Sequence, residues 1–135
     1  MPFWELYYHF TWGTKLRQPI IADEFSATLH KALVSKAIEL GCIVHAVGGV
    51  EDHVHLVVSV PPKISLSEFV RQIKGNSSHF VNHVIKPEHP FQWQSEYGVV
   101  SFGGKNLSMV VSYVINQREH HRQKTLYEYL ERISG

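Results

Sequence analysis

Two long stretches of the chain place apolar residues three or four positions apart, which is the spacing of an amphipathic helix. The first begins at Asp23, which suits an N-cap, and ends before Gly41, which suits the position after a helix. The second begins after Ser65 and Glu68, whose S-x-x-E spacing is that of a capping box. We therefore expect two long helices, each of which packs through one apolar face.

Four shorter stretches favour strands, because they are rich in β-branched and aromatic residues and end at turn residues. They cover residues 5–12, 42–50, 53–60 and 97–102. Only Glu51 and Asp52 separate the second stretch from the third, which predicts a tight hairpin. A third helix is expected from Asn106 to about His121, and a short helix is expected within residues 125–133.

This order of elements is β-α-β-β-α-β followed by a helix, which is the order of a ferredoxin-like antiparallel sheet. The predicted fold class is α+β, with two helices on one face of the sheet and a C-terminal helix that carries Tyr113. The other face of the sheet is then expected to be free for a ligand or a second subunit. A chain of 135 residues with 44% hydrophobic residues has the size and composition of one compact domain, so residues 1–135 are predicted to form a single domain.

The composition argues against several kinds of protein. The formal net charge of +1 does not suit a protein that coats nucleic acid by bulk charge, although a local basic patch is compatible with it. Cys42 is the one cysteine, so the sequence holds neither an internal disulfide nor a Cys-x-x-Cys zinc motif, which fits a reducing cytoplasm. Apolar runs fall short of the roughly 20 residues of a membrane helix. We therefore expect a cytoplasmic protein without a membrane partner.

Ten histidines are many for this length, and two of them open a strand. Residues 51–60 read EDHVHLVVSV, so His53 and His55 point to one face of the strand, and Val54 and Leu56 point to the other, apolar face. Two imidazoles two residues apart can bind one metal ion. A single His-x-His pair also occurs by chance, so a structural role stays open. Six other histidines are assigned to structure or surface, namely His9, His30, His45, His79, His83 and His89.

The predicted third helix carries a polar stripe as well as an apolar one. Tyr113 and Gln117 are one helical turn apart and therefore share the polar stripe. Tyr113 is thus expected at the edge of the helix, outside the core. The spacing alone leaves open that Tyr113 has no chemical role and that Gln117 is solvated. The residues assigned to the apolar stripe are Leu107, Val110, Val111, Val114 and Ile115.

These segments together resemble the single-tyrosine transposases of the HUH class, including their relatives that act on repetitive extragenic palindromes. HFTWGTKLRQPII resembles the first strand and basic loop of that family, and DHVHLVVSVPPKISLSEFVRQIKGNSS resembles its metal-binding strand, Pro-Pro turn and second helix. The stretch from Trp93 to SFGG and the Y-x-x-x-Q pattern of Tyr113 and Gln117 resemble its fourth strand and nucleophile helix. The four segments match in order and spacing and cover most of the chain.

The resemblance implies a DNA transposase that cleaves and rejoins single-stranded, hairpin-containing DNA through a 5′-phosphotyrosine intermediate. It implies that Tyr113 is the nucleophile, that His53 and His55 bind a divalent metal ion, and that Gln117 is the third ligand. The ion is expected to be Mg²⁺ or Mn²⁺, which suits two imidazoles, an amide oxygen and phosphate oxygens. The resemblance also implies a homodimer, in which the tyrosine helix of one subunit can complete the metal site of the other.

Other polar and aromatic residues are weaker candidates. His120 lies on the stripe of Tyr113 and is a candidate base, whereas the adjacent His121 points about 100° away, so the two are not expected to share one ion. Burial is the expected fate of three aromatic residues that could stack on unpaired bases, namely Trp12, Phe91 and Trp93. Five basic residues are candidate phosphate contacts, each with ordinary solvation as the alternative: Lys15, Arg17, Arg71, Lys74 and Lys105.

Two other functions stay open from the sequence. In a metal-dependent phosphohydrolase, the histidine pair would activate water and Tyr113 would be a bystander. In a catalytically silent DNA-hairpin-binding module of the same fold, neither the pair nor the tyrosine would react. A covalent bond between Tyr113 and DNA separates the transposase from both alternatives.

Overall fold

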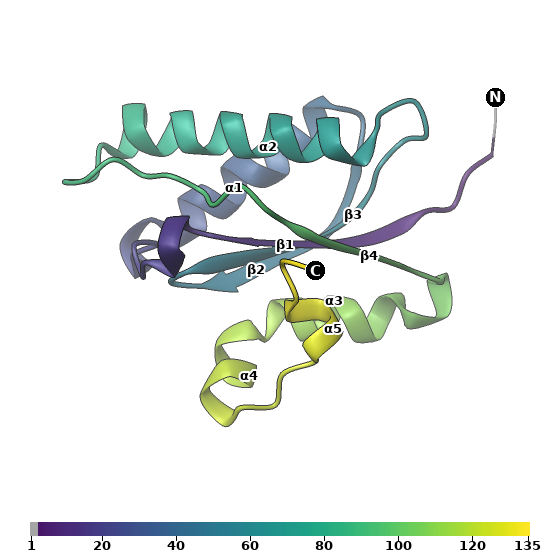
Figure 1. The fold of residues 1–135 in the computed structure, drawn as a ribbon. Coiled ribbons are helices and arrows are strands. Elements are labelled where there is room, and N and C mark those ends of the chain that lie inside the picture. Colours follow the sequence, from purple (N-terminus) through teal and green to yellow (C-terminus); the bar gives the residue numbers. More distant parts are fainter. Residues whose placement is uncertain (1–2) are drawn as a thin grey trace.

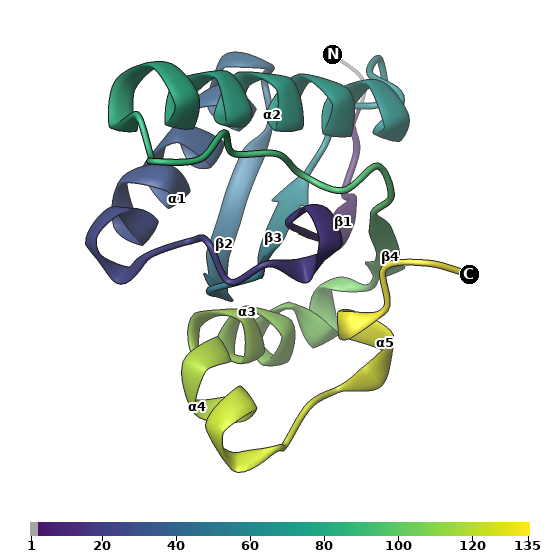
Figure 2. The same ribbon diagram turned by 60° about the vertical axis from the view of Figure 1, so that its left-hand side comes forward.

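The computed structural model describes residues 3–135 and shows a four-stranded antiparallel sheet between two layers of helices (Figure 1, Figure 2). The strand order is β2-β3-β1-β4, and the expected α+β, ferredoxin-like fold class is confirmed. All four strands lie within two residues of their predicted bounds. None of the helices within residues 3–135 is long and apolar enough to cross a membrane. The elements are β1 (Tyr7–Gly13), α1 (Asp23–Glu39), β2 (Ile43–Val50), β3 (His53–Ser59), α2 (Leu66–Phe80), β4 (Gly98–Phe102), α3 (Leu107–Ile115), α4 (Gln117–Gln123) and α5 (Glu128–Glu131).

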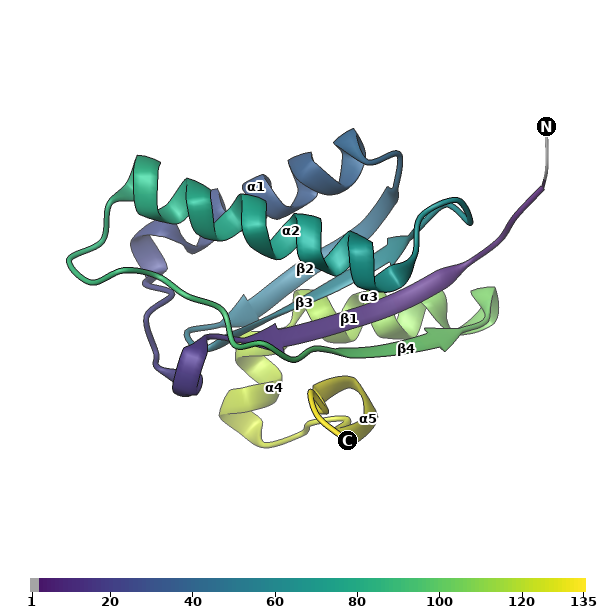
Figure 3. The ribbon, with the colours of Figure 1, turned by 45° about the horizontal axis from the view of Figure 1, so that its top comes forward.

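One face of the sheet carries the main apolar core, which α1 and α2 cover (Figure 3). Phe10 and Trp12 of β1 and Leu56 of β3 point to this face and are fully buried. Trp12 and Phe91 are both in this core, so burial, the expected fate of these aromatic residues, is confirmed for them. The two helices contribute the apolar stripes predicted from the sequence, including Phe25, Leu29, Leu33 and Ala37 in α1 and Phe69, Val70 and Ile73 in α2.

The N-cap predicted for α2 is correct, whereas the N-cap predicted for α1 is one residue off. The Oγ of Ser65 accepts a hydrogen bond from the backbone N–H of Glu68 at 3.1 Å, so the N-cap of α2 is confirmed. The Glu68 carboxylate instead accepts hydrogen bonds from Arg71, which leaves the other half of the capping box unmade. The N-cap predicted for α1 was wrong by one residue, because Ala22 is the cap and Asp23 is the first helical residue. Asp23 still lies in the first turn, where the helix dipole favours a negative charge.

The opposite face of the sheet is covered by α3, α4 and α5, which corrects the expectation of a free face (Figure 2). α3 lies close to β2, since a Cβ added at Gly48 would collide with the carbonyl oxygen of Val114. Gly98 of β4 allows an equally close approach of the C-terminal backbone at Arg132. A second, smaller core fills this layer and includes Ala46, Val57, Val110, Val114 and Leu130. Four residues of the apolar stripe predicted for the third helix pack in or against this core, namely Leu107, Val110, Val111 and Val114.

The third helix is not continuous as predicted, because it breaks at Asn116, where φ is −99° and ψ is 30°. Residues before the break form α3 and residues after it form α4. Tyr113 is 1% exposed and belongs to the second core, whereas Ile115 is 62% exposed. The predicted positions of both side chains were therefore wrong. The prediction assumed one packed face, but the C-terminal segment also packs against α3 and buries the side that carries Tyr113.

Candidate active site

His53 and His55 leave β3 on the face opposite Val54 and Leu56, as their alternation predicted. Their rings are 5.0 Å apart between centroids and nearly perpendicular. The two side chains are only 1% and 0% exposed, because the second helical layer covers them. The structure therefore places both imidazoles in a buried site between the sheet and the C-terminal helices.

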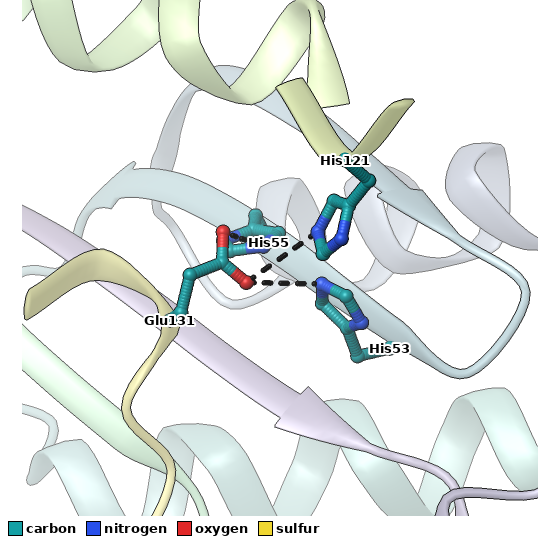
Figure 4. A group of neighbouring side chains, drawn as sticks. All are labelled: His53, His55, His121 and Glu131. Atoms are coloured by element: carbon teal, nitrogen blue, oxygen red, sulfur yellow. Dashed lines mark ion pairs between the residues drawn. The ribbon is translucent and has the colours of Figure 1, made fainter. Parts of the chain in front are cut away.

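Two further side chains reach this histidine pair from the C-terminal part of the chain (Figure 4). The carboxylate of Glu131, in α5, lies between the imidazoles, with Oε1 3.3 Å from Nε2 of His53 and Oε2 3.3 Å from Nε2 of His55. The Nε2 atom of His121, in α4, is 3.6 Å from Oε1 of Glu131. The four side chains each offer one ligand atom, and these atoms lie within 4.8 Å of one another. The sequence reasoning assigned no role to Glu131 or His121.

The chemistry of this cluster suits a divalent metal ion. Among the described residues, Nε2 of His53 and Nε2 of His55 are buried without a hydrogen-bond partner, because their contacts with Glu131 have the distance of an ion pair but not the geometry of a hydrogen bond. Buried polar atoms are rarely left unpaired in proteins. Separations of 3.3 Å are also those of neighbouring ligands around one ion bound at about 2.1 Å. The residues present therefore fit a bound metal ion.

The ionisation of His55 and Glu131 also favours a cation. Burial lowers the pKa of His55, so this imidazole is neutral at pH 7. Burial alone would raise the pKa of Glu131, but its contacts with His53 and His55 lower that pKa well below its usual range. Burial alone would also lower the pKa of His53, but the carboxylates of Asp52 and Glu131 outweigh burial and raise this pKa, so a metal ion at His53 would have to displace a proton. A neutral imidazole and an ionised carboxylate are the forms that bind a metal ion.

Tyr113 meets the same carboxylate as the histidine pair. Its hydroxyl donates a hydrogen bond to Oε2 of Glu131 and accepts one from the backbone N–H of Tyr127 at 3.2 Å. Its ring is 6.0 Å from the ring of His55 between centroids and is stacked on Tyr127. Burial and the hydrogen bond to Glu131 raise the pKa of Tyr113 to about 12. The phenol and the two imidazoles therefore share one site within a single chain.

Gln117 and His120 lie beside this site in different ways. Gln117 is buried, its Nε2 donates to the carbonyl oxygen of Tyr113 at 3.3 Å, and its Oε1 is 3.0 Å from Nε2 of His121. Its role as a metal ligand stays a prediction. The ring of His120 packs against the ring of Tyr113 at 4.6 Å, and its Nδ1 lies 2.9 Å from Oγ1 of Thr125. His120 thus contacts the ring of the tyrosine and binds Thr125 with its nitrogen.

The predicted phosphate contacts occupy three places. Arg17 forms an ion pair with Asp52 at 3.3 Å, and its Nη2 is 3.2 Å from Nδ1 of His53, so it lies at the edge of the site. Lys105 follows the end of β4 that pairs with Tyr7, far along β1 from Arg17. The other three residues line a groove of about 790 Å³ on the α2 side of the molecule, together with Trp93 and Gly75; they are Lys15, Arg71 and Lys74.

Comparison with known proteins places the chain in a family. The family model described as "Transposase IS200 like" matches residues 2–117. The chain belongs to this family. The resemblance to transposases seen in the sequence is thereby confirmed. His121 and Glu131 lie beyond the matched residues of the IS200-like domain.

Individual transposases agree with this assignment. The chain is 26% identical over 121 residues to the ISDra2 transposase TnpA of Deinococcus radiodurans, which is 86% of each protein. The crystal structure of a putative transposase from Deinococcus radiodurans R1 superimposes with a TM-score of 0.67 at 27% identity, covering 86% of this chain and 93% of that one. A REP-associated tyrosine transposase bound to a REP hairpin has the same fold, with a TM-score of 0.66 at 16% identity over 90% of this chain and 74% of that one.

Proposed function

We propose that this IS200-like transposase cleaves and rejoins single-stranded DNA with Tyr113 as the nucleophile and with a divalent metal ion held by the His53 and His55 pair. The observation that carries the proposal is the position of Glu131, whose carboxylate contacts both imidazoles and the phenol. A nucleophile and a candidate metal site, inferred from separate parts of the sequence, thus lie within reach of one carboxylate. The same arrangement gives Tyr113 a chemical environment that an incidental surface tyrosine would lack.

The residues proposed to hold the ion are His53, His55 and Glu131, with His121 close enough to join them. When bound, a divalent ion would neutralise negative charge that develops on the scissile phosphate. Three imidazoles favour Mn²⁺ over Mg²⁺, because Mg²⁺ prefers oxygen ligands and keeps several waters. Gln117 remains the ligand implied by the family resemblance. Its Oε1 atom contacts Nε2 of His121, which is itself a candidate ligand beside the histidine pair.

The proposed reaction is a transesterification at phosphorus. The phenolic oxygen of Tyr113 forms a bond to the phosphorus, the bond from phosphorus to the 3′ oxygen breaks, and that oxygen leaves as a 3′-hydroxyl after it gains a proton. The phosphotyrosine ester keeps the energy of the original bond, so a 3′-hydroxyl of another strand can reverse the step without ATP. The phenol donates a hydrogen bond to Glu131, so this carboxylate is placed to accept the phenolic proton as the oxygen attacks the phosphorus.

The groove on the α2 side is the proposed path for unpaired DNA. It carries the positive charges of Lys15, Arg71 and Lys74, and Trp93 offers an aromatic ring beside them. The turn Lys15–Arg17 joins the groove to the active site, because Lys15 lines the groove and Arg17 contacts Asp52 and His53. The structural neighbour bound to a REP hairpin supports hairpin-containing DNA as the substrate. A homodimer stays a prediction, to be checked by light scattering.

A covalent-adduct assay tests the proposal. The full chain is incubated with labelled single-stranded DNA that carries hairpins, in the presence of Mn²⁺ or Mg²⁺, and the products are separated on a denaturing gel. A slowly migrating adduct is expected for the wild type and for Tyr129→Phe, an exposed control tyrosine, but not for Tyr113→Phe.

Two results would overturn the proposal and favour its rivals. Cleavage by Tyr113→Phe at the wild-type rate, without an adduct in either protein, is the result expected of a phosphohydrolase that activates water. Tight binding of hairpin DNA by the wild type without cleavage under any metal condition is the result expected of a silent DNA-binding module.

A further inference from the structure

We propose that His9 is a positioning residue that holds the ring of His55 in the tautomer and orientation required for metal binding. The inference rests on the proposed metal site, and it concerns a residue outside the candidate ligand set. Nε2 of His9 lies 2.7 Å from Nδ1 of His55, which is the separation of a hydrogen bond. The sequence reasoning had assigned His9 to structure or surface.

The sheet brings the two histidines together. His9 lies on β1, whose partner in the register is Val57 of β3, two residues beyond His55. Side chains two residues apart share a face, so His9 and His55 are diagonal neighbours on the face that carries the active site. Their ring centroids are 4.9 Å apart, and both side chains are almost completely buried. Water therefore cannot replace His9 as the partner of this nitrogen.

The direction of this hydrogen bond follows from the position of Glu131. Nε2 of His55 faces the carboxylate and the candidate metal site, so it is the nitrogen that must be unprotonated to bind an ion. A neutral imidazole with a free Nε2 carries its proton on Nδ1. Nδ1 of His55 therefore donates to Nε2 of His9, and His9 carries its own proton on Nδ1. A side chain at position 9 that cannot accept a hydrogen bond would leave the His55 donor buried and unpaired.

The hydrogen-bond partner of His53 can be compared with that of His55. Nδ1 of His53 lies 2.6 Å from the Asp52 carboxylate, so each imidazole has an acceptor behind it. Such outer partners fix the tautomer and orientation of metal-binding histidines. One acceptor is charged and lies at the edge of the site beside Arg17, whereas the other is a neutral ring enclosed within the sheet layer. His9 thus orients His55 without adding a negative charge to the site.

Metal affinity of the full-length protein tests the role of His9. His9→Gln keeps an acceptor at the place of Nε2, and His9→Leu removes it. Calorimetric titration with Mn²⁺ is expected to show a dissociation constant about 10- to 100-fold higher for His9→Leu than for the wild type, and a value near the wild-type one for His9→Gln. Urea unfolding without metal measures any general loss of stability in both variants.

The outcomes separate this inference from the proposed function. If His9→Leu binds Mn²⁺ as tightly as the wild type, His9 does not position the ligand and the inference is wrong. Equal weakening in both variants, in proportion to their loss of metal-free stability, would show a purely structural role and also overturn it. If the wild type and His55→Ala bind Mn²⁺ equally, the metal site itself is absent and the proposed function fails with the inference. If His9→Leu does not fold, the comparison of the wild type with His9→Gln decides. The inference then requires that His9→Gln bind Mn²⁺ about as tightly as the wild type, and weaker binding would overturn it.

Discussion

The two faces of the sheet are built from different kinds of residues, although they belong to the same strands. On the face under α1 and α2, β1 and β3 present Phe10, Trp12 and Leu56 to an apolar core. On the other face, the alternate positions of these strands include His9 and His55, which are buried as deeply. Each of these strands therefore packs the core with one face and carries the candidate site on the other, because successive side chains of a strand point to opposite faces.

The two faces also differ in how much stability each contributes. Burial of an apolar side chain contributes about 1.5–3 kcal/mol, whereas a buried hydrogen bond contributes about 0.5–1.5 kcal/mol net. The polar face therefore adds less stability than an apolar face of equal area would. Thr11 Oγ1 on this face donates a hydrogen bond to the carbonyl oxygen of Val54 at 2.9 Å, whereas Nε2 of His53 and Nε2 of His55 have no hydrogen-bond partner among the described residues.

The largest effect on stability is expected from the apolar face. Leu56→Ala removes a fully buried side chain from the main core and should lower the free energy of unfolding by about 2–5 kcal/mol. The matched change on the opposite face, Thr11→Val, keeps the size of the side chain and loses its hydrogen bond, so it should cost about 0.5–1.5 kcal/mol. Urea unfolding of both variants without metal checks the order, and a larger loss for Thr11→Val would contradict the division of roles.

Metal ions are expected to stabilise only through the polar face. At a free Mn²⁺ concentration of 100 times the dissociation constant, the folded wild type should gain about 2.7 kcal/mol, and EDTA should remove that gain. Leu56→Ala should keep the whole gain, since its side chain lies across the sheet from the site. His55→Ala should lose most of it, because the variant lacks one of the two buried imidazoles that face the Glu131 carboxylate.

The same measurement decides which side chain joins the histidine pair. Glu131→Gln should reduce the stabilisation by Mn²⁺ more than Gln117→Ala does, because the Glu131 carboxylate faces both imidazoles of the pair, whereas the Gln117 amide oxygen faces His121. The reverse order would favour the ligand implied by the family resemblance and would make the contact of Glu131 incidental.

The smallest effect is expected in the groove beside α2. Burial lowers the pKa of Lys74 to about 8, so its ammonium is charged at pH 7 and mostly neutral at pH 9. If Lys74 contacts DNA, the affinity for single-stranded DNA should fall about two- to fivefold as the pH rises from 7 to 9, because one positive charge is lost. Lys74→Gln should lack this pH-dependent part, whereas Arg71→Gln should keep it, since a guanidinium stays charged throughout. Fluorescence anisotropy at constant salt measures the change.

Prediction from the sequence succeeded where the face that a side chain takes depends only on its neighbours in the chain. Alternation along β3 correctly separated His53 and His55 from the apolar positions. It failed where the surroundings depend on distant chain segments. Tyr113 was expected outside the core, yet the segment around Tyr127 stacks on it and buries it.

The fourth residue of the cluster shows the same limit more sharply. Glu131 lies in a helix of four residues with no periodic pattern, and it is 76 positions from His55 in the chain. Its position depends on Leu130, which packs into the second core, and on Gly98, which lets the C-terminal backbone approach β4. These contacts join residues that are far apart in the chain, so the spacing of residues within one element does not predict them.

The amino-acid sequence by itself determined the strands, the two long helices, the pairing of His53 with His55 and the family resemblance, because periodicity and short motifs act through neighbouring residues. Only the tertiary structure decided that a second helical layer covers the histidines, that the third helix breaks at Asn116, and that Glu131 meets both the imidazoles and the phenol. The physical reason is that close packing joins segments far apart in the chain, and a sequence pattern does not record which segments meet.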